Sequence, residues 1–187
     1  MPNSGLTVNV INLHHRQDRM MHFKEQAEDQ GFLYKRWDAE VSPFKVQNGI
    51  SRSHKQIVRW AKNTRMDKVC IAEDDLLFTS KKGWSYFISE MPDDFDLYLS
   101  GLSTGQVLSD NTVKDFSGLH LYFIHSRFYD HFLMLPEYND IDRACAGAGR
   151  FVVCNPMVAI QRNDYSDHKS AYQDYTEIWK KYTFLAD

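Results

Sequence analysis

The sequence has little cysteine, and what it has forms no recognisable motif. Three cysteines occur in 187 residues, and none forms a CxxC pair. Cys70 and Cys154 lie within apolar runs, where a buried free thiol is the usual state. Unpaired cysteines are typical of proteins in reducing compartments, so we expect a cytoplasmic protein.

Long apolar runs and an excess of one charge are also absent. No run approaches the roughly 18 apolar residues of a transmembrane helix. The opening segment, MPNSGLTVNVINL, lacks a basic region followed by a long apolar stretch, which argues against a signal peptide. With 22 Lys and Arg against 25 Asp and Glu, the net charge is −3. These totals give no sign of a partner that is a nucleic acid.

What is present suits one α/β domain spanning residues 1–187, because 43% of the residues are hydrophobic. Alternating or continuous apolar runs predict strands, and apolar positions at helical spacing predict intervening helices. The order strand, helix, strand, helix argues for an α/β sandwich with a mixed, mainly parallel sheet. The expected strands are 6–13, 32–37, 68–72, 95–99, 119–124, 151–154 and 157–160. The expected helices are 18–31, 51–64, 79–91, 126–135 and 172–182, with 101–110 as a loop.

Capping residues set several expected helix ends. Asp18 can cap the first helix, and Gly31 can end it in the left-handed conformation. Ser51 or Ser53 can cap the second helix, which would place His54 in its first turn.

The sequence VCIAEDDLLF places Glu73, Asp74 and Asp75 directly after an apolar strand. In open α/β sheets ligands bind beyond the carboxyl ends of the strands, where this triplet would lie. In extended backbone Glu73 and Asp75 project to one side and Asp74 to the other. Such a pair suits a hard cation, Mg or Mn, that neutralises a diphosphate. The alternative is a solvated acidic turn.

Several segments then resemble one family in order and spacing. They are VINLHHRQDR (10–19), GISRSH (49–54), CIAEDDLLF (70–78), HLYFIHSRFYDHFL (120–133), Asp140-Ile141-Asp142, Pro156, Gln161 and Ser166-Asp167. Together they resemble the family 25 glycosyltransferases, which include lipooligosaccharide-type sugar transferases and collagen galactosyltransferases. The resemblance covers roughly residues 7–168.

The resemblance implies a compact GT-A-like nucleotide-sugar-binding fold. It implies inverting transfer of a hexose such as galactose from a UDP-sugar, with a divalent cation, Mn or Mg. The implied acceptor is a glycan or glycolipid, as in lipopolysaccharide biosynthesis. Because such acceptors are often lipid-linked, peripheral membrane association of a cytoplasmic enzyme is compatible with it.

Candidate metal ligands are Glu73 and Asp75, with Asp74 as an alternative ligand or orienting partner. Asp167 or His168 is a candidate to complete the metal shell, although solvated loop residues fit that position equally well.

Asn12, Arg16 and Arg19 follow the first strand, where arginine suits phosphate. For Arg19 a solvated helix start is an equal alternative. Ser53 and His54 would meet an anion at a helix N-terminus. A simple N-cap and a buried histidine are their alternatives. Asp142, or Asp140 two residues earlier, is the candidate general base.

Two other classes of function remain open from the sequence. One is a non-catalytic nucleotide- or glycan-binding module of the same fold. The other is a metal-dependent phosphoesterase, since acidic clusters also serve two-metal hydrolysis.

Overall fold

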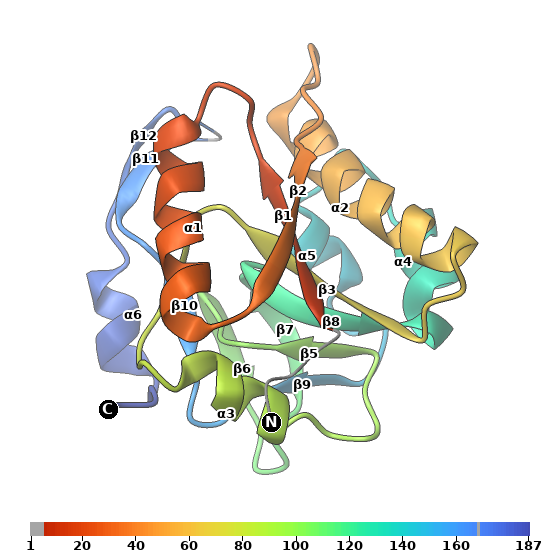
Figure 1. The fold of residues 1–187 in the computed structure, drawn as a ribbon. Helices are drawn as coiled ribbons and strands as arrows, with labels where there is room; N and C mark the ends of the chain where they lie inside the picture. The colour runs from red at the N-terminus through yellow and green to blue at the C-terminus, as the bar shows by residue number, and fades with distance from the viewer. Residues whose placement is uncertain (1–5, 168) are drawn as a thin grey trace.

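A six-stranded sheet with the order β2-β1-β3-β8-β5-β9 divides the molecule into two layers (Figure 1). The computed structural model describes residues 6–167 and 169–187. The strands of this sheet are β1 (Thr7–Asn12), β2 (Leu33–Asp38), β3 (Lys68–Glu73), β5 (Leu97–Leu99), β8 (Leu121–His125) and β9 (Phe151–Val153). Within it β8 runs against the common direction of its neighbours, and β2, β1 and β3 are parallel. The expected α/β sandwich with a mixed, mainly parallel sheet is confirmed.

Helices cover both faces of the sheet, and the alternation of strand residues supplies a core to each. Val10 and Cys70 pack on the side of α1 (Gln17–Gln30) and α3 (Gly83–Ser89). Ile11 and Ile71 pack on the opposite side. The helices on that side are α2 (Val46–Asn63), α4 (Tyr129–Met134), which follows the short 3-10 turn η1 (Ser126–Phe128), and α5 (Ile141–Cys145). Successive side chains in a strand point to opposite faces, so one apolar run serves two cores.

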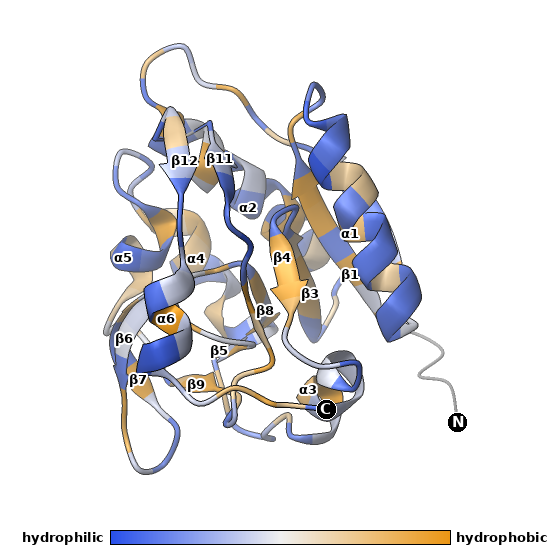
Figure 2. Cartoon of the chain, turned by 90° about the vertical axis from the view of Figure 1, so that its left-hand side faces the viewer, coloured by the Kyte–Doolittle hydropathy of each residue, from blue (hydrophilic) through white to orange (hydrophobic). Residues whose placement is uncertain are grey.

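Three two-stranded ribbons extend this framework. They are β4 (Leu76–Phe78) with β10 (Ala159–Gln161), β6 (Thr104–Val107) with β7 (Val113–Ser117), and β11 (Asp164–Ser166) with β12 (Ala171–Gln173). The β11–β12 hairpin lies towards one end of the molecule (Figure 2). Strand β4 is more hydrophobic than either strand of that hairpin. The remaining helix is α6 (Thr176–Lys181), and no helix of the described residues is long and apolar enough to cross a membrane.

The helix expected over 79–91 is limited to Gly83–Ser89, and two further expectations differ from the structure. The segment 101–110 is not all loop, because Thr104–Val107 pairs with β7. The helix expected over 172–182 is shorter, since Tyr172 pairs with Tyr165 in the hairpin and the helix starts at Thr176. In both places pairing with the neighbouring strand of a hairpin decided the local conformation.

The helix ends were predicted with mixed success. Gly31 does end α1 with a φ of 71°. Asp18 is not the N-cap, because α1 starts at Gln17 and the Asp18 carboxylate binds the Arg16 guanidinium. The second helix begins at Val46, five residues before Ser51, so neither proposed serine caps it. The pair Asn48-Gly49, a dipeptide typical of turns, lies within this helix.

Gly49 allows α2 to lie against the segment that precedes it. A Cβ atom at this position would stand 2.4 Å from the carbonyl oxygen of Glu40. We predict that Gly49→Ala lowers the free energy of unfolding by about 1–3 kcal/mol, because backbone must move to relieve the overlap. This loss opposes the gain of about 1 kcal/mol that alanine brings to a helix. Urea unfolding of the variant measures the change.

The matched control is Arg59→Ala, an exposed position on the same helix, for which we expect a change within about 0.5 kcal/mol. A Gly49→Ala variant more stable than the wild type would contradict the close approach.

Candidate functional site

A cleft of about 880 Å³ opens beyond the carboxyl ends of β1 and β3. One wall is formed by the first turns of α2, and another by α5 with the junction between β7 and β8. The segment that carries the β11–β12 hairpin closes a further side. The candidate residues from the sequence that line the cleft are Arg19, Ser53, His54, Glu73, Asp74, Asp75, Asp140, Asp142 and Asp167. The fold therefore brings together residues separated by more than 100 positions in the chain.

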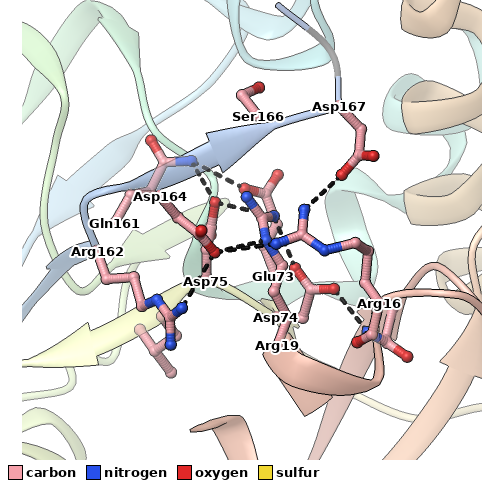
Figure 3. A network of polar contacts seen from close by, with 12 residues as sticks. Arg16, Arg19, Glu73, Asp74, Asp75, Gln161, Arg162, Asp164, Ser166 and Asp167 are labelled. Atoms are coloured by element: carbon pink, nitrogen blue, oxygen red, sulfur yellow. Dashed lines mark hydrogen bonds and ion pairs between the residues drawn. The ribbon is translucent and has the colours of Figure 1, made fainter. Parts of the chain in front are cut away.

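The acidic triplet forms the connection from β3 to β4. Glu73 is the last residue of β3, while Asp74 and Asp75 form a turn, so the expected extended backbone is wrong. The expected division of the side chains nevertheless holds (Figure 3). Glu73 and Asp75 both accept from the side-chain amide of Gln161, at 3.3 and 3.4 Å. Asp74 is bound instead by Asn12 at 2.7 Å and Arg19 at 3.0 Å.

The two converging carboxylates have opposite electrostatic behaviour. Burial, followed by the negative charge of Glu73, raises the pKa of Asp75 to about 8. Burial also opposes ionisation of Glu73, but the hydrogen bond from His54, 3.3 Å away, together with electrostatic interactions with His54, His120 and Arg19, outweighs it and lowers the pKa of Glu73. The pair therefore carries one negative charge near neutral pH, because Asp75 is buried and the two adjacent carboxylates repel each other.

This carboxylate pair fits a hard cation. Asp75 is only 7% exposed, and its Oδ1 has no hydrogen-bond partner among the described residues. Carboxylate oxygens are the ligands that Mg and Mn prefer, with other positions left to water or phosphate. No group of three or more His, Cys, Asp or Glu in the described part of the chain is arranged to hold a metal. His168, a predicted ligand, lies outside the described residues.

Arg16 and Arg19 have their donors occupied by carboxylates and a backbone carbonyl (Figure 3). Arg16 forms ion pairs with Asp18, Asp164 and Asp167. Arg19 forms ion pairs with Asp74 and Asp75 and with Asp164. It thereby connects the acidic triplet to the β11–β12 hairpin. Both arginines also donate to the carbonyl oxygen of Tyr165. The two side chains expected to face phosphate thus bind the start of α1 to the β11–β12 hairpin, and of the two only Arg19 lines the cleft.

Ser53 and His54 lie within α2 rather than at its N-terminus. The Ser53 hydroxyl donates to the carbonyl of Gly49 and accepts from the backbone N–H of Glu40. Since α2 begins at Val46, the expectation that these residues meet an anion at a helix N-terminus is wrong. His54 is 1% exposed and lies between the Tyr122 hydroxyl, at 2.9 Å, and Glu73. Through this contact His54 positions the Glu73 carboxylate of the pair.

Asp142 lies in the first turn of α5 on another wall of the cleft. Its carboxylate accepts from the backbone N–H of Gly118 at 2.9 Å. Burial raises the pKa of Asp142, and the charge of Glu73 raises it further. A carboxylate with a raised pKa is suited to accept a proton near neutral pH.

Sequence reasoning missed two residues of this site. Asp164 received no role, although it binds Arg16, Arg19 and Arg162. Gln161 was noted only for its place in the family order, yet it contacts both carboxylates. The available signal was a run of polar residues directly after an apolar strand, which does not identify partners.

Asp75 makes the metal-free protein less stable as the pH rises. The carboxyl group ionises near pH 3.8 in the unfolded chain and near pH 8 in the folded one. Between these values the folded state holds a proton that the unfolded state has released, so increasing pH favours unfolding. We predict that Asp75→Asn is more stable than the wild type at pH 8 by at least about 1.4 kcal/mol, the value of one pKa unit. The difference should disappear towards pH 4.

Urea unfolding in chelator across this pH range measures the difference. Asp93→Asn, which removes an exposed carboxylate, is the control and should follow the wild type. An Asp75→Asn variant that is less stable at pH 8 would contradict the raised pKa.

Comparisons with known proteins agree with this architecture. No protein-family model matches the chain, and neither does any curated protein. A glycosyltransferase involved in glycosylating the major capsid of PBCV-1 is similar, with a TM-score of 0.51 and 9% identity over 79% of this chain and 80% of that one. HddC from Yersinia pseudotuberculosis, complexed with GMP-PN, has a TM-score of 0.48 and 15% identity over 79% and 89% of the two chains.

A mutant of Drosophila β-1,4-galactosyltransferase 7, in complex with manganese, UDP-Gal and xylobiose, covers 96% of this chain and 74% of its own. Its TM-score is 0.42 at 11% identity. A TM-score below 0.5 does not establish a shared fold. The first likeness, at 9% identity, shows the fold alone. This chain therefore has a GT-A-like fold, as the family resemblance implied.

Proposed function

We propose that the protein is a glycosyltransferase that moves a hexose, such as galactose, from a UDP-sugar to a glycan acceptor with inversion. The observation that carries this proposal is the pair Glu73 and Asp75, which converge in the cleft and have one buried oxygen without a partner among the described residues. A glycosyltransferase fold supports it by supplying a cleft at the carboxyl ends of the strands.

Glu73 and Asp75 would hold Mn or Mg, with Asp74 orienting the turn through Asn12 and Arg19. When bound, the cation neutralises negative charge on the diphosphate leaving group. Asp142 would accept the proton of the attacking acceptor hydroxyl at a carboxylate oxygen. Its backbone hydrogen bond from Gly118 fixes that carboxylate, and its raised pKa favours the transfer.

Arg16 and Arg19 remain candidates to bind the donor phosphates. For this role Asp164 and Asp167 must release some of their hydrogen bonds, because these acids now occupy both guanidinium groups. A phosphate matches the geometry of the guanidinium fork as well as a carboxylate does. Ser53 and His54 would act by shaping the wall and supporting Glu73.

The finer assignment to the family 25 glycosyltransferases rests on the ordered segments from VINLHHRQDR to Ser166-Asp167. With it come a glycan or glycolipid acceptor, as in lipopolysaccharide synthesis, and a cytoplasmic enzyme that associates peripherally with membranes.

A non-catalytic binding module of the same fold is the second candidate function. The observation that favours it is the full engagement of Arg16 and Arg19 by acids of the chain itself. Binding of UDP without turnover of any UDP-sugar would support it. Release of phosphate from simple esters would instead support a metal-dependent phosphoesterase.

We predict that UDP with Mn raises the melting temperature of the wild type, whereas UDP with chelator does not. A ligand at 100 times its dissociation constant stabilises the folded state by about 2.7 kcal/mol. Asp75→Asn should lose the Mn-dependent increase, because one of the two anionic ligands is removed. Differential scanning fluorimetry measures these shifts, with Asp93→Asn as the control that keeps them. An unchanged shift in Asp75→Asn would reject the carboxylate pair as the cation site.

We predict that Asp142→Asn lowers kcat by about 10²- to 10⁴-fold, the usual contribution of a general base. UDP affinity should stay unchanged, since the asparagine oxygen can still accept from Gly118. Product formation from UDP-sugar and acceptor measures kcat. Asp115→Asn, which removes an exposed partner of Arg143 near the same helix, should retain activity. Turnover of Asp142→Asn within a few-fold of the wild type would assign the base elsewhere.

A further inference from the structure

Gln161 is placed against the acidic triplet by the ribbon that ends beside it. It is the last residue of β10 and pairs with Leu76, the first residue of β4. The next backbone N–H, that of Arg162, donates to the carbonyl oxygen of Asp75 at 2.8 Å. The Gln161 side chain therefore points at the two carboxylates (Figure 3).

The amide of Gln161 contacts different groups at its two ends. Its Nε2 lies 3.3 Å from Glu73 and 3.4 Å from Asp75, both long for hydrogen bonds. Its Oε1 accepts from the Ser103 hydroxyl at 2.9 Å. A hydroxyl can donate or accept, so Ser103 can satisfy this amide in either orientation. Turning the amide over would keep the contact with Ser103 and direct Oε1 towards the carboxylates.

We propose that Gln161 turns over in this way and supplies a third oxygen ligand to the cation held by Glu73 and Asp75. The inference rests on the proposed function, because it assumes a cation at this pair. Without the cation, the amide N–H groups face the carboxylates and reduce their repulsion. With the cation, the amide oxygen is the favourable end, since hard cations accept carbonyl oxygen beside carboxylate. A neutral ligand also adds no third negative charge to a buried site.

A second observation points to a ligand at this position. Asp75 is more than nine-tenths buried, and its Oδ1 has no hydrogen-bond partner within the described ranges. A buried carboxylate oxygen normally has a partner. Gln161 donates to Oδ2 of Asp75, so Oδ1 is the oxygen that the described residues leave available to a cation.

The test measures Mn affinity by electron paramagnetic resonance, and melting temperature in chelator, for the wild type and Gln161 variants. Gln161→Ala should weaken Mn binding by about tenfold or more, at least the effect of losing an outer-shell partner. Gln161→Glu should tighten Mn binding yet lower the melting temperature in chelator, because it adds a third carboxylate. These opposite changes would not follow from a merely structural role. Gln106→Glu, at an exposed position of β6, is the control and should change neither.

Gln161→Lys provides an independent variant in case Gln161→Ala fails to fold. Its ammonium group would stand between the two carboxylates, so the melting temperature in chelator should be kept while Mn binding is lost. Wild-type affinity for Mn in the Gln161→Glu and Gln161→Lys variants would overturn this inference and leave the proposed function intact. A wild type that binds no Mn would overturn the cation site, and this inference with it.

Discussion

Two carboxylates held side by side, one of them buried, are the constraint around which this site is built. At the end of β3, Glu73 and Asp75 share one amide donor, and the cost of two adjacent charges rises steeply as the dielectric falls. The two carboxylates therefore have different surroundings. Glu73 is kept ionised by His54, whereas Asp75 retains its proton until about pH 8. A folded chain keeps such a strained arrangement when the surrounding packing determines it, and sites of this kind are often functional.

The packing that determines the arrangement comes from the strands. β3 lies between β1 and β8, and all three are buried, so the chain has little freedom where β3 ends. The turn into β4 then directs Asp74 away from the other two acids, towards Asn12 and Arg19. Arg19 carries this connection to Asp164 and so to the β11–β12 hairpin. The hairpin is attached here by ion pairs and hydrogen bonds rather than by a buried apolar face, and it forms one wall of the cleft.

The cleft brings Glu73 and Asp142 within electrostatic reach of each other. Asp142 lies on α5, on the opposite face of the sheet from α1; burial raises its pKa, and the charge of Glu73 raises it further. The cleft therefore joins groups supplied by both helical layers. An inverting transfer needs the base and the leaving group on opposite faces of the sugar, and a cleft with separate walls can hold them apart.

The sequence by itself determined the framework of this protein. Apolar periodicity located β1, β2, β3 and β8 and the helices between them, because a buried face requires that pattern whatever its partners are. The same pattern placed the triplet at the carboxyl end of β3, and so at the ligand edge of the sheet. Tertiary structure decided what the sequence left undetermined. The start of α2 and the β11–β12 hairpin differ from the expectation because packing and strand pairing override the local pattern.

The same division applies to the site. Glu73, Asp75 and Asp142 were candidates from the sequence because acidic residues next to apolar elements are a recognisable pattern of ligand sites. The tasks of Gln161, Asp164 and His54 became visible only in the fold, since each depends on a partner 19 or more positions away. The neighbours of Glu73 and Asp75 in the fold, rather than their residue type, determine which of the two carboxylates is ionised and which donor faces each of them. The sequence therefore located the acids that we propose to be functional, and the tertiary structure decided how their charges are balanced.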